Sequence, residues 1–153
     1  MRTFVVSLNI TTASAGLQEL SERLGSKPSP YSQERGTRPP SIFSRFVGKA
    51  PLKFTCWRFE SRAAATSDLR MHLNSILRRF PFAKLRQRSL LPPDTEVTLD
   101  VGVCTDDHLD SFEIPAQFVR ILGRIGCKVE VTLYRGACDA CRPKRRKGKG
   151  VIG

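Results

Sequence analysis

The feature that most limits how this chain can fold is the order in which strand-like and helix-like patterns of apolar residues follow one another along it. Residues 3–10 alternate between apolar and polar side chains, which is the pattern of a half-buried strand. The same period of two appears in residues 52–60, 96–103 and 128–134. Amphipathic helical spacing appears between these segments, in residues 14–25, 66–81 and 112–126. The sequence therefore predicts the order β-α-β-α-β-α-β.

Strands that alternate with helices favour one sheet with helices packed against it. The first, third and fourth strand segments each have one apolar face and one half-polar face, which fits a sheet covered on one side. We therefore expect an α/β fold of α+β-like character, with a single mixed sheet of about four strands and helices mainly on one face. Trp57 is expected to be a core anchor, and the last strand is expected to turn Val129, Val131 and Leu133 inward. The order of the strands in the sheet stays open.

Helix boundaries are marked by polar residues and glycine. Ser14 is in the position of an N-cap for the first helix, and Gly25 is in the position of its C-cap. For the second helix, Thr66 or Ser67 is expected to be the cap, with Asp68 near the positive end of the helix dipole.

The domain organisation follows from where the periodic pattern stops. A chain of 153 residues suits one domain, and we assign residues 1–135 to a single α/β domain. Residues 26–51 form a long basic stretch with five prolines and no periodic pattern, as in a functional or mobile loop. Residues 136–153 are expected to be a disordered basic tail that contains cysteines.

The positive charge of the chain is concentrated near its C-terminus. The net charge is +12, and all fourteen acidic residues precede Cys141. Dense positive charge can neutralise phosphates without sequence specificity, so contact with nucleic acid through the tail and the 26–51 loop is one hypothesis. Its residues would be Arg142, Lys144, Arg145, Arg146, Lys147, Lys149, Arg35, Arg38 and Arg45.

The cysteines suggest a metal site only in part. Five cysteines are an odd number, which argues against a disulfide framework in a chain without a recognisable secretion signal. Cys138 and Cys141 have the spacing of half a zinc knuckle. Cys104 and His108 would complete a zinc site if the third and fourth strands run parallel and end at the same edge. The alternatives are a redox pair and, as the favoured interpretation, two reduced thiols in the tail.

The sequence contains none of the common catalytic motifs. The sequence contains no nucleophile elbow, no phosphate-binding glycine motif and no HExxH motif. The acidic cluster at residues 106–110 is more typical of a turn or a helix cap than of an acid–base pair. We therefore expect no catalytic residues, no cofactor other than the possible zinc ion, and no enzyme activity.

Several short stretches, taken in order, resemble one family. These are "LGSKPSP" after the first helix, the loop around Gly36, "CWRFES", "LRMHLNSILRRF" and "FEIPAQFVRILGRIGCKVEVTLY". Together they resemble the bacterial proteins grouped as domain of unknown function 4279, over about residues 3–134. The resemblance implies a small stand-alone α/β domain and carries over no catalytic residue. The basic 26–51 loop and the cysteine-containing tail depart from the family pattern.

We therefore expect a non-catalytic binding protein that acts as a protein-interaction module, and an immunity-type protein that masks a toxin is one form that such a module takes. The alternative is a basic nucleic-acid-associated protein, and the weakest alternative is a zinc-binding protein. No apolar run reaches the ~20 residues that a membrane helix needs, so no membrane partner and a cytoplasmic location are expected. The oligomeric state stays open.

Overall fold

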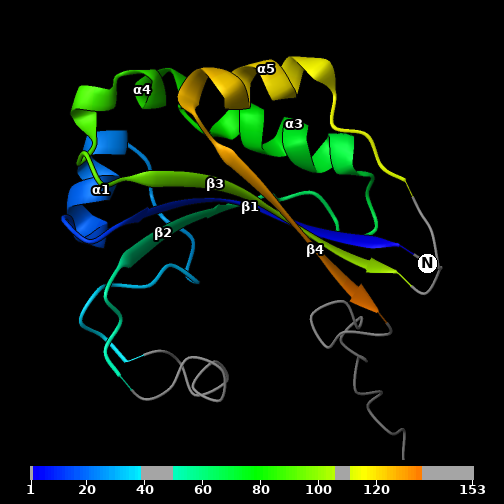
Figure 1. Ribbon diagram of the computed structural model, residues 1–153. Coiled ribbons are helices and arrows are strands. Elements are labelled where there is room, and N and C mark those ends of the chain that lie inside the picture. The colour runs from blue at the N-terminus through cyan, green and yellow to red at the C-terminus, as the bar shows by residue number, and fades with distance from the viewer. Residues whose placement is uncertain (1, 39–49, 106–110, 136–153) are drawn as a thin grey trace, which may run out of the picture.

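The computed structural model of the chain describes residues 2–38, 50–105 and 111–135. Within them a mixed four-stranded sheet has the order β2-β1-β3-β4 (Figure 1). The elements are β1 (Thr3–Thr12), α1 (Leu17–Leu24), β2 (Thr55–Glu60), α3 (Leu69–Arg79), α4 (Phe82–Arg86), the 3-10 turn η1 (Arg88–Leu90), β3 (Glu96–Thr105), α5 (Ala116–Ile125) and β4 (Lys128–Arg135). The expected α/β fold with a single mixed sheet is confirmed.

The sheet is built around β1, which pairs antiparallel with β2 on one side and with β3 on the other. β4 pairs parallel with β3. Parallel neighbours need a crossover connection, and α5 forms it. The helices of the described residues lie on one side of the sheet (Figure 1), and none of them covers the opposite side, which we call the uncovered face.

The hydrophobic core lies between the sheet and these helices. β1 contributes Phe4, Val6, Leu8 and Ile10, and β3 contributes alternate valines and Leu99 to the same layer. The predicted core role of Trp57 is correct. Its side chain is fully buried, and its indole Nε1 donates a hydrogen bond to Ser21 Oγ on α1 at 3.0 Å. This bond joins α1 to β2.

Two predictions of helix caps were wrong. The N-cap of α1 is Gly16 instead of Ser14, and Glu34 from the long loop accepts the Leu17 N–H at 2.8 Å. The N-cap of α3 is Asp68 instead of Thr66 or Ser67, because the Asp68 carboxylate accepts the Met71 N–H at 2.9 Å. Between α3 and β3 the chain forms one more short helix, α4, beyond the three helices expected from the sequence.

The predicted burial of the apolar side chains of β4 was also wrong. Val129, Val131 and Leu133 point to the same side as the core residues of β3, but they are 41%, 44% and 66% exposed. β4 is one of the two edge strands, and the described part of the chain leaves these three side chains partly open to solvent. Their alternation correctly predicted a strand, while the position of that strand in the sheet decided their exposure.

Candidate functional site

The uncovered face of the sheet carries polar residues from all four strands. Ser7 and Asn9 point to this face from the central strand β1, because they alternate with core residues. Because the strands are paired, the polar residues of this face form rows that run across the sheet. One row is Glu60, Ser7, Asp100 and Glu130, and neighbouring rows join Asn9 to Arg58 and Gly102 to Thr132.

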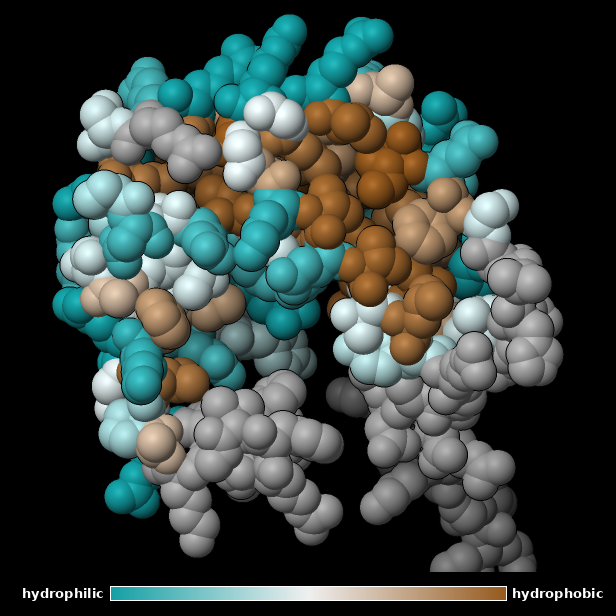
Figure 2. Space-filling view, viewed as in Figure 1, coloured by the Kyte–Doolittle hydropathy of each residue, from teal (hydrophilic) through white to brown (hydrophobic). Residues whose placement is uncertain are grey.

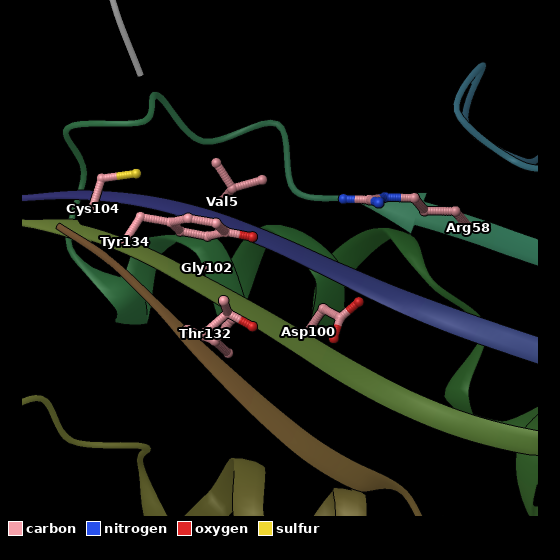
Figure 3. Close-up of a pocket in the computed structure, with 8 residues that line it drawn as sticks. Val5, Arg58, Asp100, Gly102, Cys104, Thr132 and Tyr134 are labelled. Carbon is pink, nitrogen blue, oxygen red and sulfur yellow. The ribbon is translucent and has the colours of Figure 1, made fainter. Parts of the chain in front are cut away.

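A hollow of about 290 Å³ lies on this face beside β4. It is lined by Val5, Arg58, Asp100, Val101, Gly102, Cys104, Thr132 and Tyr134. The Tyr134 ring lies across Gly102, and the polar ends of Tyr134, Arg58 and Asp100 are directed toward the space between them (Figure 3). A Cβ atom at Gly102 would lie 3.4 Å from the Tyr134 ring, so a larger residue at this position would fill part of the hollow. The hollow therefore combines an aromatic wall with charged groups.

Asp100 is the central charged group of the hollow. The Asn9 amide Nδ2 donates a hydrogen bond to its carboxylate. Burial and the neighbouring Glu130 carboxylate raise the pKa of Asp100, while Arg58 and Asn9 act in the opposite direction. Arg58 also forms an ion pair with Glu60, with 3.1 Å between Arg58 Nε and Glu60 Oε1. The negative charge at the centre of this face is therefore only partly compensated.

A second surface lies at the outer edge of β4. Val129, Val131 and Leu133 form an exposed row of apolar side chains along this strand. In the space-filling view, a brown apolar strip runs diagonally across this part of the molecule (Figure 2). No other strand in the described part of the chain pairs with the outer side of β4. Apolar surface and an unpaired strand edge therefore coincide.

The residues of the nucleic-acid hypothesis are placed only in part. Arg35 is exposed, and its guanidinium donates a hydrogen bond to the Ala13 carbonyl. Arg38 is exposed as well. Arg45 and the six basic residues of the tail lie outside the described residues, so this set stays a prediction.

The zinc hypothesis is placed in part as well. Cys138, Cys141 and His108 lie outside the described residues, whereas Cys104 is buried beside Tyr134. β3 and β4 do run parallel, with Thr105 paired to Arg135, as that hypothesis required. Within the described ranges, no three cysteine, histidine or acidic side chains are grouped as a metal would need.

Sequence reasoning missed Ser7, Asn9, Arg58 and Asp100 as site residues. Each was visible only as the polar residue of a strand alternation, which usually marks a solvated face. The missing information was the register, because residues far apart in sequence become neighbours only when β1 is placed between β2 and β3.

One comparison with known proteins identifies the family. The family model described as domain of unknown function (DUF4279) matches residues 2–136 of the chain. The chain belongs to this family. The resemblance inferred from the sequence is thus confirmed, and both the hollow and the β4 edge lie within the matched DUF4279 region. No curated protein and no solved structure matches the chain.

The DUF4279 assignment gives no activity, so the site must be interpreted from its own chemistry. In the described part of the chain, no helix is long and apolar enough to cross a membrane.

Proposed function

We propose that this DUF4279 protein is a non-catalytic interaction module that binds an extended segment of another protein along β4. The exposed apolar row of Val129, Val131 and Leu133 on an unpaired edge strand is the observation that carries this proposal. Addition of a strand to an open sheet edge is a common mode of peptide recognition, in which backbone hydrogen bonds supply affinity and alternate side chains supply specificity.

The two edges of the sheet differ in a way that supports this choice. At the β2 edge, the long loop makes backbone hydrogen bonds, with Gln33 N donating to Cys56 O at 2.9 Å and Cys56 N donating to Gln33 O at 2.8 Å. The β4 edge receives no such bonds from the described residues. Proteins usually protect an edge strand because its free N–H and C=O groups invite other chains. An apolar, unprotected edge therefore fits a binding surface.

The charges next to this edge indicate which residues a bound partner segment should contain. A strand added beside β4 would extend each row of the sheet by one side chain, so apolar residues would follow Val129, Val131 and Leu133. On the other face, the row of Asp100 and Glu130 ends in a carboxylate. Opposite charges at paired positions stabilise a sheet by about 0.2–1 kcal/mol per pair. We therefore expect a partner segment in which apolar residues alternate with lysine or arginine.

This function is tested by selection from a display library of random peptides against the full chain. Peptides with alternating apolar and basic residues should be enriched on the wild-type protein. Val131→Lys should abolish the enrichment, because it places a charge in the centre of the apolar row. Phe54→Lys is the matched control, since Phe54 is 54% exposed next to β2, at the opposite edge of the sheet.

Three outcomes would contradict the proposal. They are equal loss of binding in both variants, enrichment of peptides without the alternation, and release of bound peptide at ~0.5 M salt, where screening removes contacts that depend on exposed charge alone. Recovery of nucleic acid with the purified protein, lost on nuclease treatment, would favour the tail hypothesis. An immunity-type role requires a toxin as the partner and stays a hypothesis.

A further inference from the structure

A second hollow, of about 330 Å³, lies between α3 and the segment that follows β2. Its charged lining consists of three arginines, which are Arg62 after β2 and Arg78 and Arg79 in the last turn of α3. Among the described residues, no acidic side chain lines it. We call this hollow the arginine pocket. It differs from the hollow on the uncovered face, in whose lining charges of both signs meet.

The two sides of the arginine pocket are joined by hydrogen bonds. The Arg62 backbone N–H donates to Ser75 Oγ on α3 at 2.9 Å. The preceding residue, Ser61, has its Oγ 2.9 Å from Nδ1 of the buried His72 on the same helix. These bonds attach the segment after β2 to α3. The fold therefore brings Arg62 to the side of the helix that carries the other two arginines.

The Arg79 side chain is anchored by three contacts. Its Nη1 donates to the Glu60 carbonyl at 3.2 Å and lies 3.5 Å from Ser75 Oγ. Its Cζ atom lies 4.8 Å from the centroid of the Phe59 ring. Both hydrogen-bond acceptors are uncharged, and neither bond uses Nη2 or Nε. The guanidinium therefore keeps its charge and further donors for another group.

The positive charges of the arginine pocket lack a counter-charge. Within the part of the chain that the structure describes, Arg62, Arg78 and Arg79 form no ion pair. Burial and the positive charge of Arg62 both lower the pKa of Arg79, so the like charges repel one another. The end of the helix dipole favours basic residues in the last turn of α3, but Arg62 belongs to no helix. A bound anion would offset this repulsion.

The lining indicates which anion fits. Guanidinium groups bind phosphate and carboxylate oxygens in pairs. A carboxylate carries one charge and two oxygens, whereas a phosphate monoester carries about −1.5 to −2 charges at pH 7 and three strong acceptor oxygens. Three uncompensated arginines therefore favour the phosphate monoester. Asn74 adds an amide donor to the lining, while Ala63 and the 56% exposed Met71 add apolar surface for the group that carries the phosphate.

We propose that the arginine pocket binds the phosphate group of a small phosphate monoester. The three arginines and the Asn74 amide donate hydrogen bonds to the phosphate oxygens, and Met71 contacts the organic part of the ligand. This site goes beyond the interaction proposed for β4. Arg62 follows β2, and β2 and β4 are the opposite edges of the sheet, so the two proposals can be tested separately.

The test is a titration of the full-length, ¹⁵N-labelled protein with phenyl phosphate, in ~0.1 M sodium chloride to screen diffuse attraction to the basic tail. We expect saturable shifts of the Ala63, Asn74 and Ser75 amide signals. Methyl phenyl phosphate is the matched diester, which has lost one charge and one free acceptor oxygen. It should bind about fivefold more weakly or worse, because charge-assisted hydrogen bonds are lost.

Variants separate the arginine pocket from general basicity. Arg62→Gln and Arg78→Gln should each weaken phenyl phosphate binding by about fivefold or more. Arg124→Gln is the matched control, because Arg124 is exposed in the last turn of α5 and does not line the pocket. It should change binding by less than about twofold. Asn74→Asp keeps every arginine but adds a negative charge to the lining, so it should also weaken binding, with far-UV circular dichroism confirming the fold.

A single-stranded oligonucleotide without terminal phosphates tests whether the pocket binds a nucleic-acid backbone instead. The proposal is overturned if the oligonucleotide shifts the pocket signals and phenyl phosphate does not. It is also overturned if phenyl phosphate gives no saturable shift there, if the diester binds as well as the monoester, or if Arg124→Gln weakens binding as much as Arg62→Gln. Val131→Lys should leave phenyl phosphate binding unchanged, so that failure of the β4 proposal and failure of this one are distinguishable.

Discussion

Asp100 and Asp94 are aspartates whose surroundings affect their ionisation in opposite directions. Burial and Glu130 raise the pKa of Asp100 above the ordinary value of 3.8. Between the ordinary and the raised pKa, the folded protein holds a proton that the unfolded chain has released, so this residue makes stability fall as pH rises through that interval. Hydrogen bonds from Thr12 and from the Ala13 N–H lower the pKa of Asp94, so its contribution is lost as pH falls through the lowered pKa.

These directions predict a pair of opposite pH profiles. Relative to Asp100→Asn, the wild-type protein should lose stability as pH is raised from about 3 to 7. Relative to Asp94→Asn, it should gain stability over the same range. Urea unfolding of the three proteins as a function of pH measures both differences. If both stability differences changed with pH in the same direction, the pKa of Asp100 would not be raised by its surroundings.

The Trp57–Ser21 hydrogen bond gives a second prediction at the scale of single residues. Ser21→Ala leaves the indole N–H of a fully buried tryptophan without a partner. The free energy of unfolding should fall by about 1–3 kcal/mol. Ser111→Ala is the matched control, since Ser111 is exposed, and it should change the value by less than about 0.5 kcal/mol. An equal loss for Ser111→Ala would contradict the assignment of the effect to the buried indole N–H.

At the scale of elements, α3 shows how one carboxylate sets the start of a helix. The Asp68 side chain accepts the Met71 N–H, and the acidic group lies at the positive end of the helix dipole. Asp68→Ala should therefore destabilise the protein by about 0.5–2 kcal/mol in a thermal or urea unfolding experiment. Thr66→Ala should have little effect, because Thr66 is exposed and lies before the cap. Equal effects of the two substitutions would contradict the assignment of Asp68 as the cap.

At the scale of the whole molecule, the four strands should differ in how firmly their backbone is held. β1 is paired on both sides and contributes fully buried side chains to the core, while β4 is paired on one side. Amide hydrogen exchange is slowest where opening requires global unfolding. We therefore expect the slowest exchange in β1 and β3 and faster exchange in β4, measured by NMR on the protein alone. A bound partner segment should slow exchange in β4 selectively, whereas general slowing would point to binding elsewhere.

Local patterns were sufficient for most elements of the fold. The alternation of residues 3–10 and 96–103 and the helical spacing of residues 66–81 are short-range signals, and the corresponding β1, β3 and α3 formed as expected. The caps were harder to predict. Glu34 reaches α1 from a loop, and a single-residue pattern at Ser14 contains no information about that contact.

The sequence by itself determined that this chain forms one α/β sheet covered on one side, because periods of two and 3.6 residues show which face of each element is apolar. It also determined the family, through the order of its motifs. Only the tertiary structure decided that β4 is an edge with exposed valines and that Ser7 and Asn9 of β1 lie beside Asp100 of β3. The physical reason is that strand order and register depend on the packing of the whole molecule, whereas periodicity reports only the two sides of each element.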